Sequence, residues 1–96
     1  MSKKVIIESK LKSDRITSLI EFLEANLPNV RGFKGCQQVT VYLNREEQTM
    51  IFVEEWLSIQ AHQQYIAAIT ENGVLSQLAS FLESPPKINY FDKLEL

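Results

Sequence analysis

Along this chain the spacing of the apolar residues switches between two and about 3.6 residues, in an order that few folds accommodate. Alternation predicts strands over 4–12, 36–44 and 87–96. The almost continuously apolar segment 49–57 predicts a central strand that is covered on both faces. Helical spacing follows the first and the third of these four strands. The predicted order of elements is therefore βαββαβ.

Residues that start and stop helices mark the two helical segments. Ser13 is expected to cap the first helix, and Pro28 is expected to end it. Ser58 is expected to cap the second helix, which Gly73 then ends or bends into a shorter piece over 74–83. Because βαβ crossovers are right-handed, both helical segments should cover one face of the sheet.

This order predicts an α+β protein with one four-stranded antiparallel sheet. The 96 residues are expected to form a single domain, 1–96, without repeats or linkers. The second face of the sheet would carry its own apolar row with no helix to cover it, and such a face calls for a partner. A second copy of the chain is the simplest partner, so we expect a homodimer.

Composition argues against several classes of function. A net charge of −2 gathers no phosphates, so no nucleic-acid partner is expected. No segment approaches the roughly 20 apolar residues of a membrane helix, and the N-terminus lacks the apolar run of a signal peptide. The single cysteine, Cys36, is typical of a cytoplasmic protein. With one cysteine and one histidine, no zinc site is expected.

The segment FVEEWLSIQAHQQY gathers unusual side chains where a strand ends and a helix begins. Phe52, Glu54 and Trp56 share one face of the strand because its side chains alternate. His62 interrupts an apolar helical stripe that should face the sheet, and Tyr65 lies on the flank of that stripe. Since the strand end and the first two helical turns are close in space, these side chains are expected to converge on one pocket.

Each of these residues also has a structural interpretation. A histidine on an apolar helix face, such as His62, is commonly a hydrogen-bonded core residue. Trp56 suits a core as well as a pocket wall. Glu54 would in that case only accept a hydrogen bond from Tyr65 or from a helix N-terminus. The residues alone leave both interpretations open.

Five motifs, taken in order, resemble the antibiotic biosynthesis monooxygenase family, which includes small quinol monooxygenases. They are GFKGC (32–36), FVEEW (52–56), SIQAHQQY (58–65), NGVLSQL (72–78) and LESPPKINYFD (82–92). The resemblance covers nearly the whole chain. It implies a ferredoxin-like βαββαβ protomer that pairs with a second copy in a dimeric α/β barrel. It also implies a pocket between the sheet and the helices of each protomer.

Members of that family share the fold but differ in their chemistry. Some oxidise anthrones or hydroquinones with molecular oxygen and without a metal or an organic cofactor. For this group the resemblance implies that a base removes a proton, after which the electron-rich substrate reduces oxygen. It implies His62 as the proton acceptor and Trp56 as the wall that stacks on the substrate ring. Tyr65 and Glu54 would orient the substrate or the base, with Phe52 as a further substrate-binding residue.

The chain departs from other members of the family at two places. Haem-degrading members carry a histidine ligand ten residues after the tryptophan and an asparagine in the first strand. Here the first position is Ile66 and the first strand has no asparagine, so haem chemistry is not expected. Many other members carry a histidine nine residues after the tryptophan, where this chain has Tyr65, and His62 lies three positions earlier.

Two functions follow from these features. The first is a cofactor-independent monooxygenase that acts on a small hydroquinone-like or polycyclic phenolic substrate. The alternative is a non-catalytic dimeric barrel whose pocket binds a small apolar metabolite.

Overall fold

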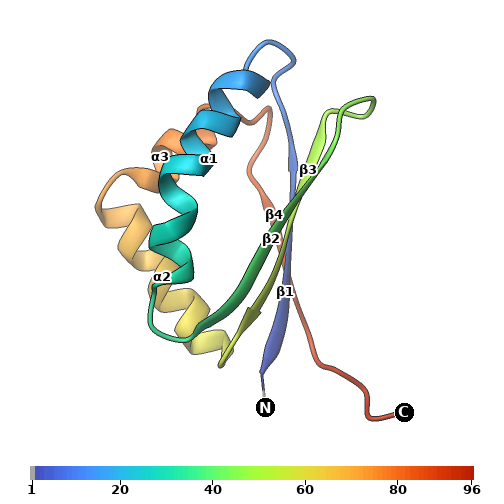
Figure 1. Ribbon diagram of the computed structural model, residues 1–96, viewed down its shortest axis with the longest axis vertical. Coiled ribbons are helices and arrows are strands. Elements are labelled where there is room, and N and C mark those ends of the chain that lie inside the picture. Colours follow the sequence, from blue (N-terminus) through green and yellow to red (C-terminus); the bar gives the residue numbers. More distant parts are fainter. Residues whose placement is uncertain (1) are drawn as a thin grey trace.

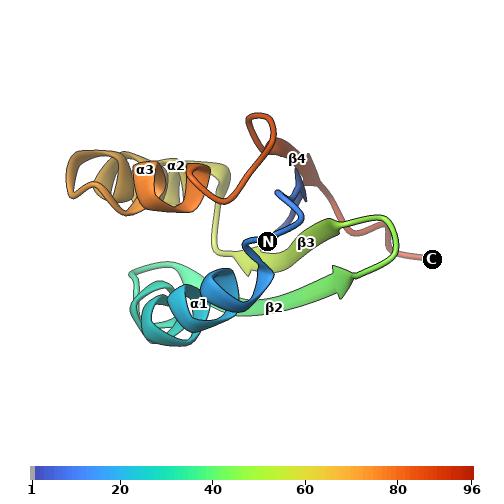
Figure 2. The same ribbon diagram turned by 90° about the horizontal axis from the view of Figure 1, so that it is seen from above.

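The structure is a computed structural model and describes residues 2–96. Its strands are β1 (Lys3–Lys10), β2 (Cys36–Asn44), β3 (Thr49–Trp56) and β4 (Lys87–Phe91), and its helices are α1 (Ile16–Arg31), α2 (Ile59–Glu71) and α3 (Val74–Ala79). The strands form one antiparallel sheet in the order β2-β3-β1-β4. Figures 1 and 2 show all three helices on one face of this sheet, with α1 beside β2 and the α2–α3 pair toward β4. The predicted ferredoxin-like βαββαβ fold is confirmed.

The strand register determines which side chains face the helices. Val5 of β1 is paired with Glu54 of β3 on one side and with Tyr90 of β4 on the other. These three side chains therefore lie in one row across the sheet, on the face that the helices cover. The buried apolar residues of this core are Val5, Ile7, Leu11, Leu19, Val30, Val39, Met50, Phe52, Trp56, Phe81 and Leu82.

Both predicted ends of the first helix were wrong. Ser13 does not cap α1, because Arg15 occupies the N-cap position and no side chain makes a capping hydrogen bond there. Pro28 does not end α1, which continues to Arg31. Val30 lies in this last turn and is buried in the core. Tertiary packing thus holds a turn that proline disfavours locally.

The start of the second helical segment was predicted correctly, and its end was not. Ser58 caps α2, since its Oγ accepts a hydrogen bond from a backbone N–H of the first turn at 3.0 Å. Gly73, at φ 87°, separates α2 from α3. The shorter helix ends at Ala79, before the predicted end, because Leu82 turns into the core and pairs with the chain beyond β1.

The last strand ends at Phe91 and not at the end of the chain as predicted, and Figure 1 shows the following segment leaving the sheet. β3 is a central strand, as predicted; the helices cover one of its faces, and the cover of its other face stays a prediction. All helices lie on one face, so Ile51 and Val53 on the other face of β3 are only half-buried. Among residues 2–96, no helix has both the length and the apolar character needed to span a bilayer.

Candidate functional site

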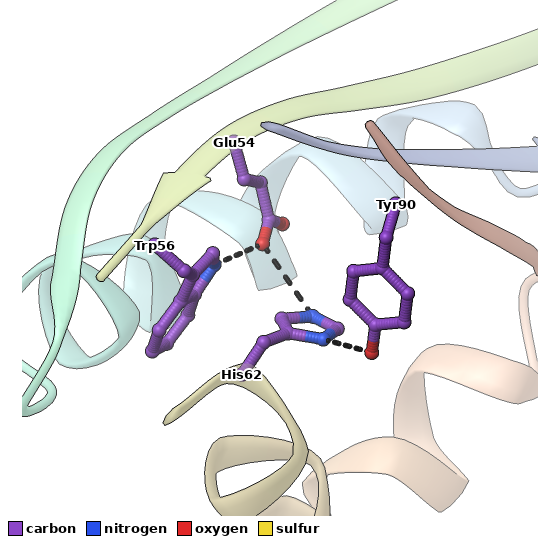
Figure 3. Close-up of polar contacts among 4 residues, drawn as sticks. All are labelled: Glu54, Trp56, His62 and Tyr90. Atoms are coloured by element: carbon purple, nitrogen blue, oxygen red, sulfur yellow. Dashed lines mark hydrogen bonds and ion pairs between the residues drawn. The ribbon is translucent and has the colours of Figure 1, made fainter. Parts of the chain in front are cut away.

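A polar cluster lies between the sheet and the helices, as Figure 3 shows; it consists of the buried Glu54, Trp56 and His62 and the half-buried Tyr90. Trp56 Nε1 donates a hydrogen bond to Glu54 Oε1 at 2.7 Å. The Tyr90 hydroxyl and His62 Nδ1 are hydrogen-bonded at 2.8 Å. His62 Nε2 lies 3.7 Å from Glu54 Oε1, beyond hydrogen-bond range, and is a buried nitrogen without a partner. Hydrogen bonds therefore link Trp56 to Glu54 and His62 to Tyr90, and a gap without a hydrogen bond separates the Glu54 carboxylate from the His62 imidazole.

Local sequence features place this cluster. The alternation of β3 turns Glu54 and Trp56 toward the helices, where both are almost completely buried. The Ser58 cap fixes the start of α2, so that His62 faces the end of β3 one turn later. Gly35 allows α2 to lie close to the sheet, because a Cβ at this position would stand only 2.7 Å from the Ala61 Cβ.

Burial shifts the pKa of each titratable group in this region. It raises the pKa of Glu54, an effect that the hydrogen bond from Trp56 partly offsets. It lowers the pKa of His62 to about 4, so the imidazole is neutral at pH 7. Burial, followed by the nearby Glu54 carboxylate, raises the pKa of Tyr65 to about 12 and also raises the pKa of Tyr90. Burial therefore makes Glu54 a stronger base than an exposed glutamate and His62 a weaker base than an exposed histidine.

A cavity of about 50 Å³ lies beside Glu54, between the sheet and the α2–α3 pair. It adjoins a wider cleft of about 420 Å³ at the surface. The residues that line both hollows are Ile66, Leu75, Leu78, Pro86 and Ile88. The recorded contacts of the Glu54 carboxylate to Trp56 and His62 both use Oε1, and Figure 3 shows the other oxygen pointing away from the indole. One oxygen of Glu54 thus remains available to a group inside the cavity.

The structure divides the predicted site residues into two sets. Phe52, Glu54 and Tyr65 line the cavity. Trp56 and His62 are not among its lining residues; both have no exposed surface and pack behind it. The Trp56 ring lies 5.4 Å from the Tyr65 ring and 5.3 Å from the His62 ring, measured between centroids. The expected convergence therefore exists, but the tryptophan and the histidine form its supporting layer.

The hydrogen-bond partners differ from those that the structural interpretation offered. Glu54 accepts its hydrogen bond from Trp56, and neither Tyr65 nor a helix N-terminus donates to it. His62 has the burial and the hydrogen bond of a core residue, while its second nitrogen faces a carboxylate. The role of His62 as a proton acceptor remains a prediction.

Sequence reasoning missed Tyr90, the partner of His62. Its position in an alternating strand indicated which neighbours share its face, but not which strand lies next to β4. The pairing of β4 with β1 brings Tyr90 into the row of Val5 and Glu54, within reach of α2. The strand order of the sheet, which alternation does not reveal, is what shows that Tyr90 lies near His62.

Metal ligation has no candidate here. Over residues 2–96, no group of three His, Cys, Asp or Glu side chains is placed to hold a metal ion. Ile66, which stands where haem-degrading members of the family carry their histidine ligand, lines the cavity with an apolar side chain. We therefore assign no metal-binding role to any side chain of the site.

The fold and the site together define a small α+β protein of the ferredoxin-like kind, with an apolar pocket between sheet and helices. Residues 4–68 match the antibiotic biosynthesis monooxygenase family. The chain belongs to this family. Comparison with curated protein sequences finds no match.

Solved structures share the fold at low sequence identity. A conserved protein from Methanosarcina mazei Go1 superposes with a TM-score of 0.85 at 18% identity, over 98% of this chain and 94% of that one. Rv0793 from Mycobacterium tuberculosis gives 0.82 at 18% identity, over 100% and 98% of the two chains. The monooxygenase ActVA-Orf6 of Streptomyces coelicolor, in complex with nanaomycin D, gives 0.78 at 17% identity, over 99% and 89%.

Proposed function

We propose that this protein is a cytoplasmic monooxygenase that uses molecular oxygen, without a metal or an organic cofactor, on a small hydroquinone-like or polycyclic phenolic substrate. One observation carries the proposal: the Glu54 carboxylate lines a cavity whose other walls are almost entirely apolar. Membership of a monooxygenase family supports the reaction class. The single cysteine supports a reducing compartment.

The first step of the proposed reaction is proton transfer to Glu54. A substrate hydroxyl in the cavity donates a hydrogen bond to the free carboxylate oxygen, and the carboxylate then removes its proton. Burial favours this step, because it raises the pKa of Glu54 and strengthens the carboxylate as a base. The apolar walls also exclude water from the reacting atoms.

Electron transfer follows once the substrate is deprotonated. The electron-rich anion passes one electron to oxygen, and the two radicals combine to form a carbon–oxygen bond. For an anthrone, the CH₂ group becomes C=O: one oxygen atom enters the ring system, and the other leaves as water with the two hydrogens. The substrate thereby supplies all the electrons that oxygen receives.

His62 and Tyr65 have distinct roles in this proposal. His62 is neutral at pH 7 and its Nε2 lies 3.7 Å from Glu54 Oε1, so it would support the carboxylate from behind as a neutral side chain, while the proton on Glu54 leaves with the water formed from oxygen. Tyr65 lines the cavity with Phe52 and is held by the Trp56 ring. It would contact the hydroxyl-bearing edge of the substrate.

Oxygen uptake tests the proposal. Purified protein is supplied with hydroquinones, naphthohydroquinones and anthrones in an oxygen electrode, and autoxidation is subtracted. Uptake that requires the protein and falls in Glu54→Gln supports the proposal. An uptake equal to background over the whole panel would refute it.

The alternative is a non-catalytic protein that binds a small apolar metabolite. The complete burial of Trp56 and His62 favours it, because neither side chain reaches a ligand in the cavity without movement. This function predicts saturable binding of aromatic compounds with no oxygen consumption. The oxygen electrode and a binding titration therefore separate the two functions.

We also propose that the protein acts as a homodimer joined through the open face of its sheet. No helix of residues 2–96 covers this face, as Figure 2 shows. Apolar and aromatic side chains lie on this face of all four strands; they are Ile6, Tyr42, Ile51, Val53 and Phe91. Two of them, Tyr42 and Phe91, are at least half exposed in the single chain, at 55% and 50%. Pairing with a second copy would remove this surface from water.

A further inference from the structure

The cleft that leads to Glu54 has a one-sided distribution of charge. Its two hollows are lined by apolar side chains, by Tyr65 and Ser84, and by two charged residues, Glu54 at the inner end and Glu83 in the outer cleft. Within the described chain, no lysine, arginine or histidine is among the lining residues. Both charged groups that a ligand meets are therefore carboxylates.

Two basic residues near the outer cleft, Lys10 and Arg15, are engaged elsewhere. The Lys10 side chain donates to the backbone oxygen of Glu47, on the hairpin between β2 and β3. The Arg15 guanidinium lies over the Phe81 ring, 4.7 Å from its centroid. No ion pair is recorded for Glu83 among residues 2–96. An anionic group of a ligand would thus find no cation among the residues 2–96 that line the two hollows to replace its hydration.

The two volumes determine how a ligand fits. A cavity of about 150 Å³ lined by apolar side chains holds one benzene ring. The inner hollow, at about 50 Å³, is too small for a ring and accommodates only a hydroxyl-bearing edge. The outer cleft, at about 420 Å³, has room for fused rings. A ligand would therefore place its hydroxyl at Glu54 and its ring body between α3 and the Pro85–Pro86 turn.

We propose that this cleft selects uncharged aromatic alcohols and excludes analogues that carry a carboxylate, sulfonate or phosphate group. The inference rests on the proposed function and narrows its substrate class. A neutral hydroxyl forms a charge-assisted hydrogen bond with Glu54. An anionic group in the outer cleft loses hydration against apolar walls and is repelled by Glu83, with no compensating ion pair.

Two ligands that differ in charge and by one methyl group test the selection. These are 6-hydroxy-2-naphthoate and its methyl ester, which share the hydroxyl and the fused rings. Binding to the wild-type protein is measured by isothermal titration calorimetry under nitrogen, so that no turnover occurs. We expect the ester to bind roughly tenfold more tightly than the acid, or better.

A variant with reversed charge in the outer cleft provides the second arm. In Glu83→Lys the preference for the ester should shrink by roughly fivefold or more, because a cation now faces the carboxylate. Glu46→Lys is the matched control: it makes the same change of charge on the exposed hairpin turn, at a residue that lines neither hollow, and should keep the wild-type preference.

The results of these titrations test the charge selection, and they are independent of the oxygen-uptake results that test the monooxygenase reaction. Equal affinities, tighter binding of the acid, or binding of neither ligand would overturn the proposal. So would a preference that Glu83→Lys and Glu46→Lys change equally. Selective binding of the ester without oxygen uptake would uphold the selection and refute the monooxygenase.

Discussion

At the scale of single residues, the account depends on Glu54. It is one of two adjacent glutamates that the pleat of β3 sends to opposite faces. Glu54 enters the core and reaches the cavity, whereas Glu55 lies on the open face and pairs with Lys4 at 3.0 Å. The two positions therefore form a matched pair for mutation.

Replacing the carboxylate of Glu54 should remove turnover and preserve the fold. Glu54→Gln keeps an oxygen that accepts the hydrogen bond from Trp56 but offers no base, so kcat should fall by about 100-fold or more. Glu55→Gln should leave kcat unchanged. Steady-state oxygen uptake measures both, and circular dichroism verifies the fold. Similar rates for wild type and Glu54→Gln would remove Glu54 from the mechanism.

The lowered pKa of His62 predicts that the folded protein loses stability in acid. Its folded pKa, about 4, lies below its ordinary value near 6.5, so protonation favours the unfolded chain as the pH falls through this range. The shift corresponds to about 3 kcal/mol, present above pH 6.5 and lost near pH 4. Glu54 has the opposite sign, because its raised pKa means that protonation stabilises the folded state.

The contribution of His62 is best measured where Glu54 cannot titrate. Urea unfolding of Glu54→Gln at pH 7 and at pH 4 should show the full loss. The free energy of unfolding of Glu54→Gln combined with His62→Gln should depend less on pH, because glutamine does not titrate in this range. Glutamine can still hydrogen-bond to Tyr90, so the local structure should be kept. An equal acid loss in both proteins would assign the effect to other groups.

Much of the candidate site follows from alternation and helical spacing. The shared face of Phe52, Glu54 and Trp56 and the inward position of His62 were predictable, because each depends on residues near in sequence. Which side chains border the cavity was not predictable. That depends on how far α2 stands from the sheet and on the strand next to β4, and both are tertiary features.

At the scale of elements, the position of α2 depends on its contact with Gly35. This residue has φ +93°, and a Cβ there would lie 2.7 Å from the Cβ of Ala61. Gly73 has a similar φ of +87°, but a Cβ there would meet nothing within 4 Å. The two glycines separate backbone strain from steric overlap.

Replacing each of these two glycines with alanine should lower the free energy of unfolding by different amounts. Gly73→Ala should destabilise the protein by about 1–2 kcal/mol through backbone strain alone. Gly35→Ala should cost a further 1–3 kcal/mol, because the helix and the loop must move apart. Ala61→Gly in the Gly35→Ala background should recover part of that excess. Equal free energies of unfolding for the two alanine variants would contradict the close contact.

Helix ends were the least predictable parts of the elements. Ser13 and Pro28 carry the local signals of a start and a stop, and α1 follows neither. The reason lies outside the helix, in the burial of Leu19 and Val30 against the sheet. Ser58 and Gly73 acted as predicted, since no packing at those positions opposes the local preference.

At the scale of the whole molecule, the order of apolar spacings predicted the topology, and the structure confirms it. The right-handed crossovers that place all helices on one face also leave the other face open. The sequence shows an apolar row on this face, but the periodicity of a single chain does not show what covers it. The homodimer is therefore tested in solution.

A charge at the centre of the open face should separate the proposed dimer. Val53 lies on β3 between Ile6 and Thr40 of the neighbouring strands, so Val53→Lys would bury a lysine without a partner. We expect the mass in sedimentation equilibrium to fall from that of a dimer to that of a monomer. Ile20→Lys, on an exposed position of α1, should leave the dimer intact. A wild-type protein that sediments as a monomer would contradict the proposal.

The most direct measurement is turnover under oxygen-18 gas, with the product analysed by mass spectrometry. The wild-type protein and Glu54→Gln are supplied with the anthrone or naphthohydroquinone that gave the highest oxygen uptake. We predict that the wild-type product contains one labelled oxygen atom, that the other appears in water, and that Glu54→Gln forms this product about 100-fold more slowly. A product without label above the autoxidation background, or equal labelling rates in the two proteins, would contradict a monooxygenase with Glu54 as its base.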